Sequence, residues 1–364
     1  MKPYRILQIG SGMPGWAGTE RYLTDLTLGL RERGHEVTIA CADGSKLDAK
    51  CHEVGIPHIR LVMRRTLDWR QLPAFVQAMR RGYDVVHIHG YRDYVIPAVA
   101  ARLTRVPAVV MTRHLPHAFR SRSRARLCSC LFYDKIIAVS HFVQNVLLSS
   151  GVPAERVAVV HNAIGPTPPA ADGRRSLREE FGIPADAFLV AAAGRIEPPK
   201  GFDVLVRAMQ RVDGHCIIFG GGDRSYLESL VLELGLSGRV HVPGFRPDVA
   251  RLWASADVAV VPSTSPDCFP YAAIEALAAG VPLVGSRIGG IPETCDDGCA
   301  VLVPPGDVGA LAAALSSLAA SAERRRAMGA AGRARAAQFT FERMIHDVEQ
   351  VYHTLLDEQP CRTR

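Results

Sequence analysis

Short apolar runs alternate with helical patterns twice along this chain, and a proline-rich segment separates the two series. In the first series, runs such as 5–9 and 85–88 are followed by amphipathic patterns such as 19–34. Strands that are apolar along their whole length and alternate with helices are typical of parallel sheets covered by helices on both faces. The pattern therefore predicts an α/β fold with a doubly wound parallel sheet in each half.

The segment that separates the two series spans 165–173 and contains three prolines and two glycines, a composition that excludes a helix or a central strand. The length of 364 residues suits two domains, whose facing sheet edges would form a cleft where ligands bind. We expect an N-terminal domain (1–165), a linker (166–180), a C-terminal domain (181–337) and a C-terminal helix (338–358) that packs back on the first domain.

Several classes of protein are disfavoured by simple counts. No uncharged apolar run reaches the ~18–20 residues of a membrane span, and the first residues lead into a strand instead of a signal peptide. The nine cysteines are scattered and odd in number, which favours reduced thiols in a cytosol. The pairs Cys128-x-Cys130 and Cys295-x3-Cys299 lack the spacing of zinc sites. His35 is expected at the surface.

Charge is distributed unevenly between the halves. Residues 1–165 hold 19 Arg and 4 Lys against 12 acids, whereas residues 166–364 hold 19 Arg and 1 Lys against 24 acids. The basic first half indicates an anionic partner, although a high arginine content can also scatter charge in this way.

The densest cluster of positive charge consists of arginines in the first half. On a helix, side chains four residues apart share one face. The cluster favours contact with an anionic membrane surface or a phosphorylated acceptor over a solvated loop. Nucleic acid is a weaker interpretation because few aromatic residues are interleaved. The arginines are Arg113, Arg120, Arg122, Arg124 and Arg126.

A second candidate site follows the first strand of the second half. Gly194 permits a tight exit from that strand, Arg195 offers a planar fork for phosphate oxygens, and Lys200 adds a point charge. The helix expected at 203–211 contributes its positive end. The segment is interpreted as a phosphate site, with a solvated surface loop as the alternative.

Two acids stand eight positions apart further along the chain. Asp267 lies in a loop, and Glu275 lies in an otherwise apolar helical run, where a buried carboxylate needs hydrogen-bond donors. A ribose diol is such a donor pair, and the alternatives are a helix cap or a core ion pair. The backbone N–H groups of Phe269, Tyr271 and Ala272 can point at an anion.

Two other patterns are weighed against these sites. Residues 10–15 match the spelling of a dinucleotide-binding loop, with Asp43 placed to bind a ribose, which would suit an NAD-dependent oxidoreductase. The expected helix begins after Gly15, which disfavours that reading. His87 and His89 are two positions apart in an expected strand and therefore lie on the same face. They are interpreted as metal ligands or, more simply, as the end of a strand that enters the cleft.

Motifs in a fixed order extend over residues 4–340. Those of the first half are 15–21, 84–90, Thr112-Arg113-His114, Ala138-Val139-Ser140 and 161–164. Those of the second half are Gly194-Arg195 with Lys200-Gly201, Gly220-Gly221-Gly222-Asp223, Val242-Pro243-Gly244, Pro262-Ser263, Asp267 with Glu275, and 289–293. The ordered set resembles glycosyltransferase family 4, the retaining enzymes of the GT-B fold, which implies two Rossmann-like domains facing a central cleft.

The resemblance also implies residue roles. Arg195 and Lys200 would hold the donor diphosphate, and Glu275 would bind the ribose hydroxyls. Asp267, where the family usually has Glu, would approach the transferred sugar. His114 would contact that sugar from the acceptor side, and Gly18 would bring its backbone close to the phosphate.

The function implied is retaining transfer of a sugar from a nucleotide-diphosphate donor to a surface polysaccharide, a lipopolysaccharide core or a lipid-linked glycan. No metal or other cofactor is expected, and neither is nucleic acid. The leaving phosphate can accept the acceptor's proton, or Asp267 can act as a nucleophile. We expect a cytoplasmic protein with peripheral contact to the inner face of a membrane. Sugar transfer to a small metabolite and an inactive sugar-nucleotide-binding protein are the alternatives.

Overall fold

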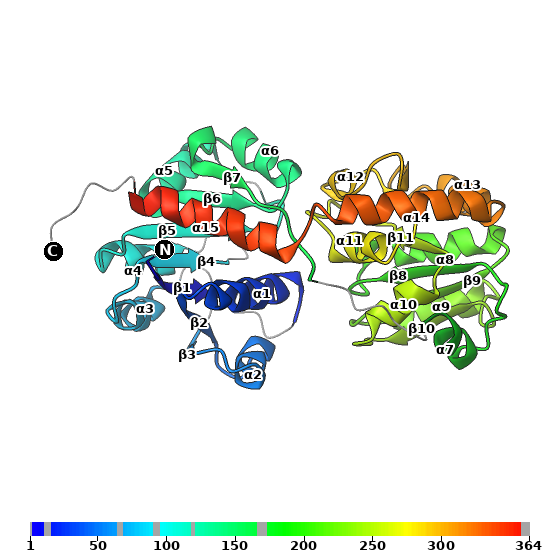
Figure 1. The fold of residues 1–364 in the computed structure, drawn as a ribbon, viewed down its shortest axis with the longest axis horizontal. Coiled ribbons are helices and arrows are strands. Elements are labelled where there is room, and N and C mark those ends of the chain that lie inside the picture. Colours follow the sequence, from blue (N-terminus) through cyan, green and yellow to red (C-terminus); the bar gives the residue numbers. More distant parts are fainter. Residues whose placement is uncertain are drawn as a thin grey trace. The chain divides into compact units, whose positions relative to one another are not determined.

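The computed structural model describes residues 2–10, 16–63, 68–89, 95–117, 121–165 and 173–357. The chain divides into two compact units, of which the first is 1–163 together with 341–364 and the second is 164–340. In each unit helices cover both faces of a parallel sheet (Figure 1). The predicted pair of doubly wound domains is therefore confirmed. Among the described residues, no helix combines the length and apolar character needed to cross a bilayer.

The sheet of the first unit has the strand order β3-β2-β1-β4-β5-β6-β7, with parallel pairing between neighbours. Its strands are β1 (Arg5–Ile9), β2 (Glu36–Ala42), β3 (His58–Leu61), β4 (Val85–Ile88), β5 (Ala108–Arg113), β6 (Lys135–Ala138) and β7 (Val157–Val159). The central strands are short and buried, because helices remove both of their faces from water.

The helices of the first unit include one from the far end of the chain. They are α1 (Gly18–Glu32), α2 (Lys46–Glu53), α3 (Leu72–Met79), α4 (Val95–Leu103), α5 (Arg122–Phe132), α6 (His141–Ser149) and α15 (Phe341–Asp357). Helix α15 packs on α1 and completes the core with Met344, Val348 and Tyr352. A Cβ at Gly29 of α1 would lie 2.0 Å from Ile345 Cδ1, so the two helices meet where α1 has no side chain.

The second unit repeats the arrangement. Its sheet order is β10-β9-β8-β11-β12-β13. The strands are β8 (Leu189–Ala193), β9 (His215–Phe219), β10 (Val240–Gly244), β11 (Val258–Val261), β12 (Leu283–Ser286) and β13 (Ala300–Val303). The helices are α7 (Gly173–Glu180), α8 (Phe202–Ala208), α9 (Ser225–Glu233), α10 (Val249–Ser255), α11 (Tyr271–Ala278), α12 (Ile291–Thr294), α13 (Val308–Ala319) and α14 (Ala322–Ala336).

The structure corrects some expectations. The predicted linker runs to residue 180, yet residues 173–180 form α7, whose Leu177 is fully buried in the core of the second unit. The motif Val242-Pro243-Gly244 forms the end of the strand β10. His35, expected at the surface, is 5% exposed, because α15 covers it and Glu349 Oε1 accepts from its Nε2 at 2.9 Å.

Candidate functional site

The loops that follow β8 and β11 are neighbours at the carboxyl edge of the second sheet. From β8 the chain continues to β9 on one side, whereas β11 lies on the other side of β8 and leads away to β12. The sheet order therefore reverses between β8 and β11. Such a switch point leaves a crevice at the carboxyl ends of the strands, which is where open α/β sheets bind ligands.

The loop after β8 is held by close backbone packing. The N–H of Ile196 donates to the carbonyl of Gly221 at 2.8 Å, and a Cβ at Gly220 would lie 2.0 Å from the carbonyl oxygen of Gly194. Arg195 extends from this loop with its side chain 56% exposed and pairs with Glu197 at 2.7 Å. The guanidinium is therefore accessible to a ligand at the edge of the sheet.

A tight turn at the end of this loop places Lys200 next to the loop that follows β11. Gly201 has φ 68°, and a Cβ there would lie 2.1 Å from the carbonyl oxygen of Pro262. The N–H of Thr264 donates to the carbonyl of Pro199 at 3.0 Å. The two loops are thus fixed to each other by their backbones.

This fixed contact brings Lys200 to Asp267, its partner 67 positions away in the chain. The Nζ of Lys200 donates to Oδ2 of Asp267 at 2.5 Å, and both side chains are largely buried. A third loop supports the acid, because the N–H of Gly290 donates to the carbonyl of Asp267 at 2.6 Å. The structure therefore unites two predicted catalytic residues, a contact that sequence spacing did not reveal.

Glu275 lies one turn into α11 and is half-buried. Its Oε2 accepts from the indole Nε1 of Trp253 at 3.4 Å. Tyr271 and Ala272 form the first turn of α11, at the positive end of its dipole. Phe269 is 3% exposed and packs edge-on against Phe339, with ring centroids 5.0 Å apart. The predicted donor-binding residues of this segment therefore gather at the start of α11.

In the first unit, His114 follows β5 and ends a chain of hydrogen bonds across three strands. Gln8 Oε1 lies 2.5 Å from Nε2 of His89, and Nδ1 of His89 lies 3.3 Å from Nε2 of His114. A carbonyl oxygen only accepts, so His89 carries its proton on Nε2 and accepts at Nδ1. His114 then donates from Nε2, which leaves its Nδ1 as an acceptor.

Burial determines the charge of these rings. It lowers the pKa of His114 to about 3, lowers that of His87 to about 3 and places that of His89 well below its usual value. His87 is enclosed by Tyr352 and Thr112, whose oxygens lie 2.5 and 2.6 Å from its ring nitrogens. His87 and His89, predicted as a strand end or as metal ligands, therefore belong to a neutral buried network.

Gly18, predicted to bring its backbone close to the donor phosphate, is the first residue of α1. The preceding residue, Ala17, donates from its backbone N–H to Oε2 of Glu20 at 3.0 Å. Glu20 is 3% exposed. No pattern in the sequence indicated that this carboxylate, in the first turn of α1, is buried.

The predicted basic cluster is divided by the fold. Arg122 and Arg126 are exposed on α5, beside the exposed Leu127 and Leu131. Arg113 is instead 2% exposed and donates from Nη2 to the carbonyl of His117 at 2.7 Å. Arg120 lies outside the described residues, and so does the side chain of Arg124.

A cavity of about 590 Å³ lies elsewhere in the first unit, between β3 and α3. Its lining includes three arginines, Arg60, Arg70 and Arg81. None of the predicted site residues is among the lining residues, so this cavity does not define the candidate site.

Two family profiles match this chain and together cover most of it. The profile described as "Glycosyltransferase Family 4" matches residues 16–167, and the one described as "Glycosyl transferases group 1" matches residues 173–335. The chain belongs to glycosyltransferase family 4. The resemblance drawn from its motifs is therefore confirmed.

Individual relatives of this glycosyltransferase are distant but cover nearly all of the chain. D-inositol 3-phosphate glycosyltransferase of Xylanimonas cellulosilytica is 28% identical over 98% of this chain and 95% of its own length. The enzyme of the same name from Mycolicibacterium smegmatis is 27% identical over 98% of this chain and 90% of its own.

Solved structures agree on the fold of the glycosyltransferase. A glycosyltransferase of Rickettsia africae covers 99% of this chain and 100% of its own, at a TM-score of 0.90 and 20% identity. Anabaena HepE in complex with UDP covers 96% of this chain and 100% of its own, at a TM-score of 0.84 and 24% identity. Sucrose-phosphate synthase of Thermosynechococcus elongatus is 26% identical at a TM-score of 0.80, over 97% of this chain and 99% of its own.

Proposed function

We propose that this glycosyltransferase moves a hexosyl group from a nucleotide-diphosphate sugar to an anionic or lipid-linked glycan acceptor, with retention of the anomeric configuration and without a metal in the reaction. The observation that carries the proposal is the Lys200–Asp267 pair at the switch point between β8 and β11. The solved complexes of Anabaena HepE with UDP and with UDP-glucose support a nucleotide-sugar donor in this fold.

The chemistry follows from how charge develops. As the glycosidic bond breaks, negative charge grows on the diphosphate, and nearby cations stabilise the transition state more than the ground state. Lys200 and Arg195 supply these cations, and the first turn of α11 adds a positive helix end. The leaving phosphate oxygen can take the proton of the acceptor hydroxyl on the same face of the sugar, which gives retention.

Asp267 then has a role tied to the donor. In this structure its carboxylate accepts the hydrogen bond of Lys200. A diphosphate would compete for the same ammonium group, which frees Asp267 to accept from a hydroxyl of the transferred sugar. His114, neutral with Nδ1 as an acceptor, suits a second sugar hydroxyl and does not suit a proton donor near neutral pH.

Two candidate classes of acceptor are supported by different observations. The exposed Arg122 and Arg126 with Leu127 favour a lipid-linked or membrane-bound anionic acceptor. The relatives named D-inositol 3-phosphate glycosyltransferase favour a small phosphorylated polyol as the second candidate. Both acceptors are anionic, in agreement with the basic character of the first half.

The donor assignment is tested by the release of nucleoside diphosphate from a panel of nucleotide sugars. Lys200→Met is expected to lower kcat by roughly 10²–10³-fold, because it removes a cation from the transition state. Glu275→Ala is expected to raise the KM for the donor. Arg207→Met, an exposed cation on α8, is the matched control. Activity of Lys200→Met within twofold of wild type contradicts the assignment, and rates unchanged by EDTA support metal independence.

The acceptor is tested with the same release assay. Inositol phosphates are compared with lipid-linked glycans in vesicles that contain anionic lipid. Arg122→Glu with Arg126→Glu is expected to weaken vesicle binding and use of the lipid acceptor. Arg324→Glu with Arg326→Glu, an exposed pair on α14, is the control. Equal loss in both double variants, or no loss in either, contradicts the role of α5.

A further inference from the structure

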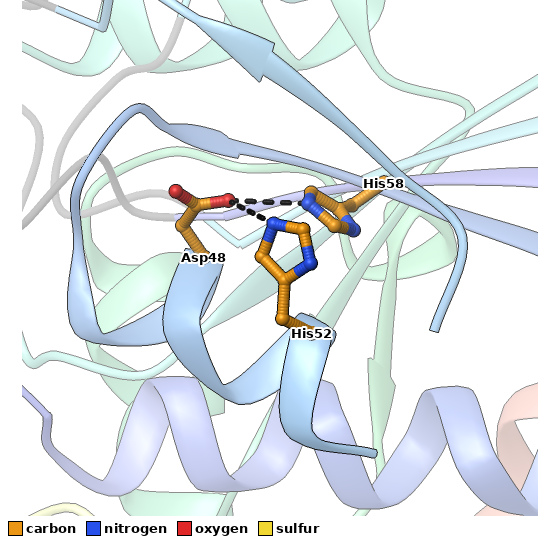
Figure 2. Close-up of side chains that lie close together, drawn as sticks. All are labelled: Asp48, His52 and His58. Carbon is orange, nitrogen blue, oxygen red and sulfur yellow. Dashed lines mark ion pairs between the residues drawn. The ribbon is translucent and has the colours of Figure 1, made fainter. Parts of the chain in front are cut away.

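Three potential metal ligands meet at the β3 edge of the first sheet. Asp48 and His52 lie one turn apart on α2, and His58 is the first residue of β3 (Figure 2). Oδ1 of Asp48 lies 3.1 Å from Nε2 of His58 and 3.9 Å from Nε2 of His52. The three atoms lie within 4.8 Å of one another. Zinc bonds of about 2.0–2.2 Å in a tetrahedral site require ligand separations of this order.

Two of the three ligands are oriented by a second hydrogen bond. Nδ1 of His58 lies 3.0 Å from the carbonyl oxygen of Ile56, which only accepts, so this nitrogen carries the proton. The backbone N–H of Gly44 donates to Oδ2 of Asp48 at 3.1 Å. His58 Nε2 and Oδ1 of Asp48, the oxygen that does not accept from Gly44, therefore face each other. Outer hydrogen bonds of this kind fix the ligands of zinc sites.

The ligand set indicates which cation would bind. Two imidazole nitrogens and one carboxylate oxygen suit zinc and similar divalent transition ions, whereas calcium and magnesium prefer oxygen ligands. The side chain of His52 is 59% exposed, while those of Asp48 and His58 are 7% and 13% exposed. The solvent side of the cluster thus leaves a position for water.

Arg60 supplies the positive charge at this cluster in the structure. Its Nε donates to Oδ1 of Asp48 at 2.9 Å, and its Nη2 contacts Nε2 of His52. The side chain is about half exposed, and Nε also lies 3.6 Å from Asp43. Arg60 lines the cavity between β3 and α3 as well. The guanidinium therefore has an acid and an open space to move to when another cation takes its place.

We propose that Asp48, His52 and His58 form a binding site for a zinc-like divalent cation, and that the cation exchanges with the guanidinium of Arg60. The bound ion would join α2 to β3. The competing explanation is a permanent ion pair between Arg60 and Asp48 that needs no metal. The two explanations predict different effects of Arg60→Ala on Zn²⁺ binding, because only the exchange makes Arg60 a competitor whose removal tightens binding.

The test measures Zn²⁺ binding to the full chain by calorimetry, after removal of metal with a chelator and with thiols kept reduced. His58→Gln and His52→Gln are each expected to abolish the binding of one equivalent of Zn²⁺ or to lower its affinity. The loss of affinity should exceed the roughly 10–100-fold that follows when a residue hydrogen-bonded to a metal ligand is removed. Arg60→Ala is expected to bind Zn²⁺ more tightly. His346→Gln, an exposed histidine on α15, is the control and retains the wild-type isotherm.

Co²⁺ provides a second readout that does not depend on stability. Visible d–d absorption of the Co²⁺-loaded protein is expected to decrease in His52→Gln, whose side chain is exposed and whose loss leaves the core intact. Wild-type Zn²⁺ isotherms in His52→Gln and His58→Gln overturn the proposal. If Arg60→Ala binds Zn²⁺ with the same affinity as wild type or more weakly, the proposed exchange is wrong. Donor turnover does not enter these measurements.

Discussion

Charge at single residues is decided by what surrounds them. His114, His87 and His89 share an environment that disfavours the imidazolium form, whereas Glu349 on α15 keeps its carboxylate charged. Burial alone would raise the pKa of Glu349, but hydrogen bonds from His35 and Arg33 outweigh burial and lower it. The charged or neutral state of each group therefore reflects its contacts and not its residue type alone.

The buried histidines predict a dependence of stability on pH. Between pH 6.5 and about 3 the unfolded chain binds protons at His114 that the folded chain does not bind, so acidification favours unfolding. Each such group contributes up to about 1.4 kcal/mol per pH unit in this window. His114→Asn should therefore lose less stability than wild type between pH 6.5 and pH 5, measured by thermal unfolding.

The control for this measurement is His346→Asn, an exposed histidine in the same unit. If wild type and His114→Asn lose the same stability between the two pH values, His114 is accessible to protons in the folded state.

At the level of elements, close packing depends on residues that lack side chains. Gly29 lets α1 approach α15, and Gly201 lets the turn of Lys200 contact the loop after β11. Helix α15 is further tied to the first unit by Glu349, which accepts from Arg33 Nη1 at 2.7 Å and from His35 Nε2 at 2.9 Å. These contacts position a helix that follows the whole second unit in the chain.

Gly29→Ala is expected to destabilise the protein by about 1–3 kcal/mol, because the new Cβ overlaps Ile345 in a packed core. In the background of Ile345→Ala the same substitution is expected to stabilise by up to about 1 kcal/mol, because alanine is a better helix former than glycine. Urea unfolding of the four proteins measures this coupling. Additive effects would show that α1 and α15 do not meet at Gly29.

At the level of the whole molecule, the two units differ in which parts of the chain form them. The second unit is continuous, whereas the first requires residues from both ends of the chain. Residues of α15 are buried among those of α1 and the central strands. The first unit therefore lacks part of its core until the last helix has been synthesised.

This difference predicts the behaviour of fragments. Residues 164–340 alone should unfold cooperatively, because their two core layers are complete. Residues 1–163 alone should lack a cooperative transition, because removal of α15 exposes apolar surface on α1 and the sheet. Circular dichroism during heating measures both. A fragment 1–163 that melts at the same temperature with and without an added peptide of residues 341–357 would contradict this prediction.

The sequence by itself determined the α/β class, the two doubly wound domains and the family. These properties are local, because periodicity, proline and glycine act on neighbouring backbone. The motifs also placed Arg195, Lys200 and the start of α11 at one sheet edge, since parallel strands end together.

Only the tertiary structure decided which distant side chains meet. The Lys200–Asp267 pair joins loops 67 positions apart, and the tautomers of His89 and His114 follow from Gln8 on another strand. The burial of Arg113 depends in the same way on how its strand packs. Such contacts cannot be predicted from the periodicity of the sequence, because hydrogen bonds and desolvation depend on distances in space and not on separation along the chain.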